Sequence, residues 1–348
     1  MLNRRVGYFD LLRIIAIACV VLTHASAKFV TDYPSNSIDF ILGNIFDSIS
    51  RIGAPLFFMI SGALILDENK KFNCKDKVIK FLLILLCWSL FYAVITHILL
   101  PLVFYKRAID FEAFITACIT GHFHLWYLWA TIGLYLITPI LKLFVNKQNS
   151  QYVLYFLILS FIVQNGLPFL VSVFNLLNLG ALSNVLVSSL AYIKTNLNLD
   201  FVCGYLPYFI LGWYVTNFNF TIPQKTLIYV LGIISLLLII ILVQCNPLSQ
   251  DVFYDRRGLL VFICSLAVFI LVRTLYKSNP LVEDKINLLS KLTFGVYVIH
   301  ETILALISQV LLFSVFFVPV VWLVTLVLSF LVAFGLSKIP KLNKLINF

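Results

Sequence analysis

The chain has 348 residues, of which 61% are hydrophobic and only 11% are charged, and its formal net charge is +10 at pH 7. Ordinary soluble domains are about 45–50% apolar and about 25% charged, so this composition excludes a soluble globular fold. The basic residues form no cluster of the kind that binds nucleic acid, so we expect no nucleic-acid partner.

Apolar stretches near the roughly 20 residues that a helix needs to cross a bilayer recur from one end of the chain to the other. In lipid, each backbone N–H and C=O must be satisfied within its own segment, so these stretches should be helices. The sequence therefore predicts an all-α, polytopic integral membrane protein with a single integral domain over residues 1–348. The ten expected spans are residues 9–28, 45–66, 78–100, 124–144, 152–173, 201–218, 226–244, 258–276, 292–313 and 316–337.

The lysine and arginine residues indicate which side of the bilayer each connection faces. With the N-terminus inside, the inner connections and tails carry 17 of the 25 basic residues, and the outer connections carry six. The remaining two, Arg13 and Arg51, lie within expected spans. Because cytoplasmic segments are enriched in Lys and Arg, this bias predicts that both the N- and C-termini are cytoplasmic.

The N-terminus also resembles a secretory signal peptide, with a basic start, an apolar run and small residues at positions 25–27. Two observations argue against cleavage. Asp10 and Arg13 interrupt the apolar run, and removal of the segment would leave an odd number of spans and disturb the charge bias. We therefore treat residues 9–28 as a membrane span.

The first expected span places two ionisable groups on one helical face. Arg13 and His24 are 11 residues apart, which corresponds to about 20° around the helix axis and about 16 Å along it. A charged side chain within a span costs about 2.5–3.5 kcal/mol on insertion scales, so it needs a partner or a function. Asp10 can pair with Arg13, either as an interfacial anchor or as part of a site. His24 is either an interfacial residue or a general base for a hydroxyl group.

The second expected span carries another arginine. Arg51 lies inside the span, because residues 52–66 alone are too short to cross. Asp47, four residues earlier, is placed to neutralise it. Alternatively, Arg51 points into a polar cavity shared with His24 and orients an acceptor or a developing oxyanion. Gly62 is expected to allow close helix packing.

Two later spans contribute further candidates. Trp126 follows His122 and His124 at the start of the fourth span, where aromatic residues commonly form an interfacial belt, and Trp126 is also a candidate for substrate binding. His300 and Glu301 lie near the middle of the ninth span, where ionisable groups usually face a cavity or a partner, so both are candidate substrate-binding residues. The histidine spacing matches no metal-ligand set, so we expect no metal.

Several segments together resemble one family. Asp10-Leu-Leu-Arg13, followed by ten residues and His24, is similar to an arginine-x10-histidine signature. The chain resembles the acyltransferase 3 family, which contains membrane-bound O-acetyltransferases of bacterial surface glycans. Further blocks resemble the family in the expected order at residues 51–66, 124–141, 205–215 and 292–304.

The resemblance implies a multi-pass enzyme of the bacterial cell (inner) membrane that transfers an acyl group, expected to be acetyl. The donor would be cytoplasmic acyl-CoA, namely acetyl-CoA, and the acceptor a hydroxyl of a cell-surface polysaccharide or a lipid-linked glycan. Arg13, His24 and Asp10 would be catalytic, and other glycan-synthesis membrane proteins are candidate partners. The family carries arginines before the third span, where this chain has Lys77 and Lys80. Lysine binds phosphate as a point charge without a bidentate fork, so CoA contact there should be weaker.

A protein of a different class remains an alternative. Ionisable residues within spans also mark proton and substrate paths, as in a glycan exporter or a proton-coupled secondary transporter. Broken helices at corresponding positions of two halves would favour transport, and none is evident in the sequence.

Overall fold

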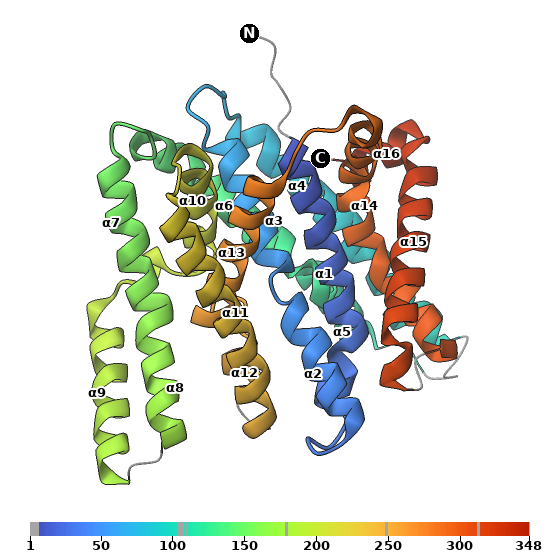
Figure 1. Cartoon of the computed structure of the whole chain (residues 1–348). Coiled ribbons are helices and arrows are strands. Elements are labelled where there is room, and N and C mark those ends of the chain that lie inside the picture. Colours follow the sequence, from blue (N-terminus) through green and yellow to red (C-terminus); the bar gives the residue numbers. More distant parts are fainter. Residues whose placement is uncertain are drawn as a thin grey trace.

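The computed structural model describes residues 7–102, 108, 110–177, 180–247, 250–311 and 314–347, and every regular element in these ranges is a helix (Figure 1). The all-α prediction is confirmed. The α-helices are α1 (Gly7–Thr31), α2 (Ile38–Ser50), α3 (Gly53–Ile65), α4 (Cys74–Val94), α5 (Phe111–Thr120), α6 (Trp126–Phe144), α7 (Ser150–Ser160), α8 (Leu167–Leu177), α9 (Ala181–Leu197), α10 (Leu206–Asn217), α11 (Ile222–Cys245), α12 (Gln250–Phe253), α13 (Leu259–Leu275), α14 (Pro280–Leu311), α15 (Val318–Ser337) and α16 (Pro340–Ile346).

Eight stretches of the described chain are long and apolar enough to cross a membrane, which confirms the polytopic prediction. The other two expected spans, at 201–218 and 258–276, correspond to α10 and α13. These helices have only 12 and 17 residues, fewer than the roughly 20 of a full crossing. The start of α1 and the C-terminal α16 lie at the same end of the molecule (Figure 1). That this end is cytoplasmic remains a prediction.

The second expected span differs from its prediction because it is broken. The stretch Ile38–Ile65 begins at an N-cap, where the Ser37 hydroxyl accepts a hydrogen bond from the Phe40 N–H at 3.1 Å. It divides into α2 and α3 at residues 51–52. Gly53, just after the break, lies against α1, where a Cβ atom would come within 2.8 Å of the Ala16 carbonyl oxygen. After the break, the chain therefore comes into close contact with the first helix at Gly53.

Helix α14 is longer than the ninth span that the sequence predicted. It begins at Pro280, 12 residues before the expected start at 292, and has 32 residues, or about 48 Å of length. Since a bilayer core is about 30 Å thick, one end of α14 extends beyond it. This single helix carries Ser290 and Lys291 near one end of the bundle and His300 and Glu301 deeper within it.

Helix α1 lies at the centre of the bundle and packs against α2, α3, α14 and α15. Helices α3 and α10 cross at two glycines. A Cβ atom at Gly62 would clash with the Phe209 carbonyl, and one at Gly212 would clash with the Met59 carbonyl. The expectation that Gly62 allows close packing is therefore confirmed.

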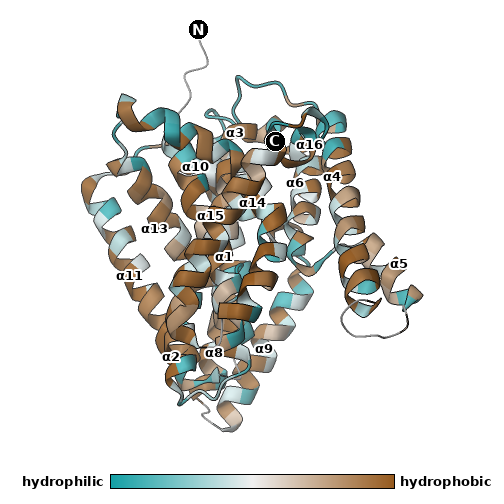
Figure 2. Ribbon diagram, turned by 90° about the vertical axis from the view of Figure 1, so that its right-hand side faces the viewer, coloured by the Kyte–Doolittle hydropathy of each residue, from teal (hydrophilic) through white to brown (hydrophobic). Residues whose placement is uncertain are grey.

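The outer surface of the bundle is mostly apolar (Figure 2). Large aliphatic side chains on α4, α11 and α15 are more than half exposed, among them Leu86, Ile233 and Leu331. In water this area would be costly to expose, whereas in a bilayer it contacts lipid. The polar side chains inside the bundle must therefore have their partners or their function within the protein.

Candidate active site

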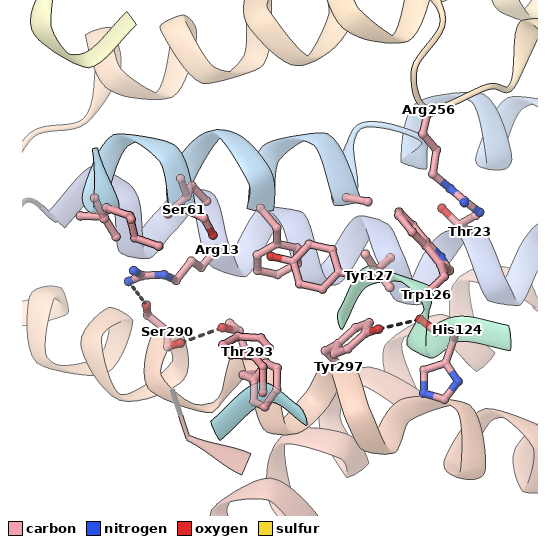
Figure 3. Close-up of a pocket in the computed structure, with 18 of the residues that line it drawn as sticks. Arg13, Thr23, Ser61, His124, Trp126, Tyr127, Arg256, Ser290, Thr293 and Tyr297 are labelled. Atoms are coloured by element: carbon pink, nitrogen blue, oxygen red, sulfur yellow. Dashed lines mark hydrogen bonds between the residues drawn. The ribbon is translucent and has the colours of Figure 1, made fainter. Parts of the chain in front are cut away.

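A cavity of about 470 Å³ runs between α1, α3, α6 and α14. One of its ends lies toward the start of α1 and is lined by Arg13, and the opposite end is lined by Trp126 and Arg256 (Figure 3). The cavity is also lined by His24. Arg13 and His24, which were expected to share a helical face, therefore line one cavity, although the catalytic roles of the two residues remain predictions.

At the first end, Arg13 belongs to a small polar network. Its Nη1 atom lies 2.9 Å from Asp10 Oδ1. The same atom lies 3.3 Å from Ser290 Oγ (Figure 3). The Ser290 hydroxyl in turn donates to Asp10 Oδ1 at 2.7 Å. The Asp10 side chain is only 4% exposed, whereas that of Arg13 is 28% exposed. Asp10 thus orients the guanidinium from behind while Arg13 faces the cavity.

Two lysines add positive charge to the same end of the cavity. Lys77, expected from the sequence, and Lys291, which the sequence interpretation did not single out, both line it. Lys80 is not among the lining residues, and its ammonium donates to the Asn347 carbonyl oxygen at 3.1 Å. Together with Arg13, the two lining lysines make this end a site for an anion such as phosphate.

At the other end, His24 meets a carboxylate from a distant part of the sequence. Its Nδ1 atom lies 3.8 Å from Glu301 Oε2, and both side chains are less than one-fifth exposed. The rings of His24 and His300 have centroids 5.2 Å apart. The tertiary structure thus joins three residues that the sequence placed in two separate spans.

The tautomer of His300 follows from its contacts. Its Nδ1 atom lies 2.7 Å from the Tyr297 carbonyl oxygen, which can only accept, so Nδ1 carries the proton in the neutral ring. Its Nε2 atom is buried and has no hydrogen-bond partner in the described part of the chain. His300 is fully buried and is not among the residues that line the cavity, so it lies behind His24 rather than in direct reach of a substrate.

The ligand atoms of His24, His300 and Glu301 lie within 4.8 Å of one another, so this group could in principle hold a metal ion. In a tetrahedral zinc site with bonds of about 2.1 Å, ligand atoms are about 3.4 Å apart. The spread here, up to 4.8 Å, is looser than that geometry, so the side chains would have to move closer together to bind an ion.

Arg51 lies where both of its sequence interpretations placed it, although its role toward an acceptor or an oxyanion remains a prediction. Its Nε atom donates to Asp47 Oδ2 at 2.7 Å, so the buried aspartate neutralises it. Its guanidinium also lies 4.2 Å from the centre of the Tyr254 ring and lines the cavity. The Ser26 hydroxyl donates to the other Asp47 oxygen at 3.3 Å, which fixes the carboxylate. Arg51 is therefore a rigid donor at the His24 end.

Arg256 was missed by the sequence interpretation. It comes from the connection between α12 and α13, where it counted only as one outer basic residue. In the structure it lines the cavity, and its guanidinium lies 4.7 Å from the centre of the Trp126 ring (Figure 3). The Trp126 ring in turn lies 5.2 Å from that of Tyr205. A loop residue gave no periodic signal, so only the fold could bring it to the site.

His124 also lines the cavity, although its position at the start of a span had favoured an interfacial role. Its ring is 5.5 Å from that of His300, and its backbone carbonyl accepts a hydrogen bond from the Tyr297 hydroxyl at 2.6 Å (Figure 3). This bond ties the short 3-10 turn η3 (Phe123–Leu125), which precedes α6, to α14 and helps to fix the wall of the cavity at the His24 end.

The spans and the enclosed charged cavity define the class as a multi-pass membrane protein with an internal polar site. The family model described as an acyltransferase domain matches residues 6–338, so the chain belongs to this family, acyltransferase 3. The resemblance found in the sequence is thereby confirmed over nearly the whole chain, and the protein is a multi-pass membrane acyltransferase. Searches of curated proteins and of solved structures gave no match.

Proposed function

We propose that this protein transfers an acetyl group from cytoplasmic acetyl-CoA to a hydroxyl of a cell-surface polysaccharide or a lipid-linked glycan, within the bacterial cell membrane. The observation that carries the proposal is the continuity of the cavity. Its one volume is lined by Arg13 and Lys77 at one end and by His24 at the other.

The positively charged end suits the donor. Arg13, Lys77 and Lys291 provide donors for the phosphate groups of CoA, and Asp10 keeps the Arg13 guanidinium in place. Along α1, this end is about 16 Å from His24. The pantetheine arm would span that distance and bring the thioester to the imidazole.

The opposite end supplies acid–base chemistry. The Nδ1 atom of His24 is the ring nitrogen near Glu301, which leaves Nε2 for the acceptor hydroxyl. His24 takes the hydroxyl proton as the oxygen attacks the thioester carbonyl carbon, and Glu301 stabilises the resulting imidazolium. Arg51 or Arg256 stabilises the tetrahedral oxyanion. The C–S bond then breaks, and His24 returns the proton to the departing CoA sulfur.

A covalent variant uses the same residues. The neutral His24 nitrogen attacks the thioester carbonyl carbon, and the C–S bond breaks to release CoA thiolate and leave an acyl-imidazolium. The sugar hydroxyl then attacks the acyl carbon, the N–C bond breaks, and the hydroxyl proton passes to the CoA thiolate. Both routes require the His24 imidazole, as a general base in the first and as the nucleophile in the second. Loss of the imidazole is therefore expected to abolish transfer, with a residual rate at background.

The test uses inside-out membrane vesicles supplied with isotope-labelled acetyl-CoA. The wild-type protein should place label on glycan, and His24→Ala should place none while its expression and thermal unfolding are unchanged. His97→Ala is the matched control, because His97 lies in the turn η1 (Ile95–Leu99) and does not line this cavity. Normal acetylation by His24→Ala would refute the mechanism. Glycan movement across the vesicle membrane without label would instead support the exporter alternative.

A further inference from the structure

We propose that a second cavity, beside the candidate active site, binds sugar units that neighbour the acetylated one in a glycan acceptor. This inference rests on the proposed function and names the acceptor as an oligosaccharide or polymer. The second cavity has a volume of about 530 Å³. It lies between the π-helical turn η4 (Phe161–Gly166), α8, α9 and the connections that precede α10 and α13.

The two cavities share a wall. Arg256 lines the first cavity, and its chain neighbours Asp255 and Arg257 line the second. The connection before α10 also contributes to both cavities. Gly204 lines the second cavity, and the ring of the next residue, Tyr205, packs on Trp126, which lines the first. Residues that are consecutive in the chain thus line both volumes, so a chain of sugars could extend from one to the other past Arg256.

Two buried amides provide the strongest sign of a ligand. The side-chain NH2 groups of Gln164 and Asn165 both donate to the Arg257 carbonyl oxygen. This fixes the direction of each amide, because a carbonyl oxygen can only accept. The two amide oxygens are buried and have no hydrogen-bond partner within the described ranges, and both residues line the cavity. Asn165 is only 1% exposed. Buried acceptors without partners call for donors from a ligand or from water.

The local backbone explains how two consecutive amides come to face one cavity. Residues 161–166 form a π-helical turn between α7 and α8, which adds a residue to the helical repeat. Such turns are frequent at functional sites. Gln164 and Asn165 both lie in this turn, and both side chains reach the same Arg257 carbonyl oxygen, which holds the two amides side by side.

The charges of the cavity favour a neutral, hydroxyl-rich ligand. Three carboxylates, Asp200, Asp251 and Asp255, face two cations, Lys194 and Arg257. Arg257 is already paired with Asp255 at 3.3 Å. An anionic lipid head group would meet an excess of negative charge here, whereas sugar hydroxyls can donate to carboxylates and amide oxygens alike. Apolar side chains in the same lining suit the C–H faces of a sugar ring.

The test compares acceptors of different length. Oligosaccharides are released by mild acid from the surface polysaccharide of the cells that make this protein, and are then separated by size. With labelled acetyl-CoA, kcat/KM should rise with acceptor length. The variant Ala191→Trp, which fills the second cavity from α9, should lower kcat/KM at least fivefold for long acceptors and less than twofold for the shortest. Val185→Trp is the control, because Val185 is 60% exposed on the same helix and does not line the cavity.

A binding measurement that needs no turnover separates this inference from the proposed function. Fluorescently labelled long and short oligosaccharides are titrated into the purified protein in detergent. Weaker binding of only the long oligosaccharides to Ala191→Trp supports the second cavity as a subsite. Equal binding by this variant and the wild type, or no binding by the wild type, overturns it. Binding without any acetylation would instead refute the proposed function and leave the subsite supported.

Discussion

Glu301→Gln is the substitution that most directly tests the proposed acid–base pair. It keeps the size of the side chain and removes its charge, 3.8 Å from His24 Nδ1. At that distance, an imidazolium and a carboxylate attract by about 4 kcal/mol at an effective dielectric constant of about 20, and by about 1 kcal/mol in water. Both side chains are mostly but not fully buried, so the contribution lies between these limits. Each 1.36 kcal/mol is about tenfold in rate, so kcat should fall by roughly 10- to 1000-fold.

The assay is single-turnover transfer of labelled acetyl from acetyl-CoA to glycan by protein reconstituted in liposomes. The KM for acetyl-CoA should change little, because Glu301 is remote from the positively charged end of the cavity. Asp284→Asn, which changes an exposed carboxylate near the start of the same helix, should behave as the wild type. A Glu301→Gln rate within threefold of the wild type would show that the carboxylate does not support His24.

Three further predictions concern the donor end, the acceptor end and the packing. Lys77→Ala should raise the KM for acetyl-CoA more than Lys80→Ala, because only the first lysine lines the cavity; equal effects in steady-state kinetics would contradict this. Arg256→Gln should raise the acceptor KM about tenfold, or about 1.4 kcal/mol, with the acetyl-CoA KM unchanged. Gly212→Ala should lower stability by about 1–3 kcal/mol or more in thermal unfolding in detergent, because its Cβ clashes with α3. Gly133→Ala, whose Cβ meets nothing within 4 Å, should be neutral, and equal unfolding of the two variants would argue against the close crossing.

The sequence by itself determined the class of fold and the first helical face. Composition and the length of apolar stretches require a helical membrane protein, because lipid offers no partner for backbone polar groups. The shared face of Arg13 and His24 follows from helix geometry alone, and the shared cavity agrees with it. Local signals of this kind depend only on residues that are close in sequence, so they can be read before the fold is known.

The tertiary structure decided what these residues meet. The pairing of His24 with Glu301 joins residues 277 positions apart, and no local periodicity encodes it. Arg256 and Lys291 reach the cavity only because α14 and the connection before α13 pack beside α1 and α3. The break between α2 and α3 falls just before Gly53 and Pro55, residues that weaken a helix, although a single continuous span was expected there. The π-helical turn at Gln164 was not expected from the sequence either. The chemistry of the site thus depends on side chains from distant spans, and their distances are set by how the helices pack.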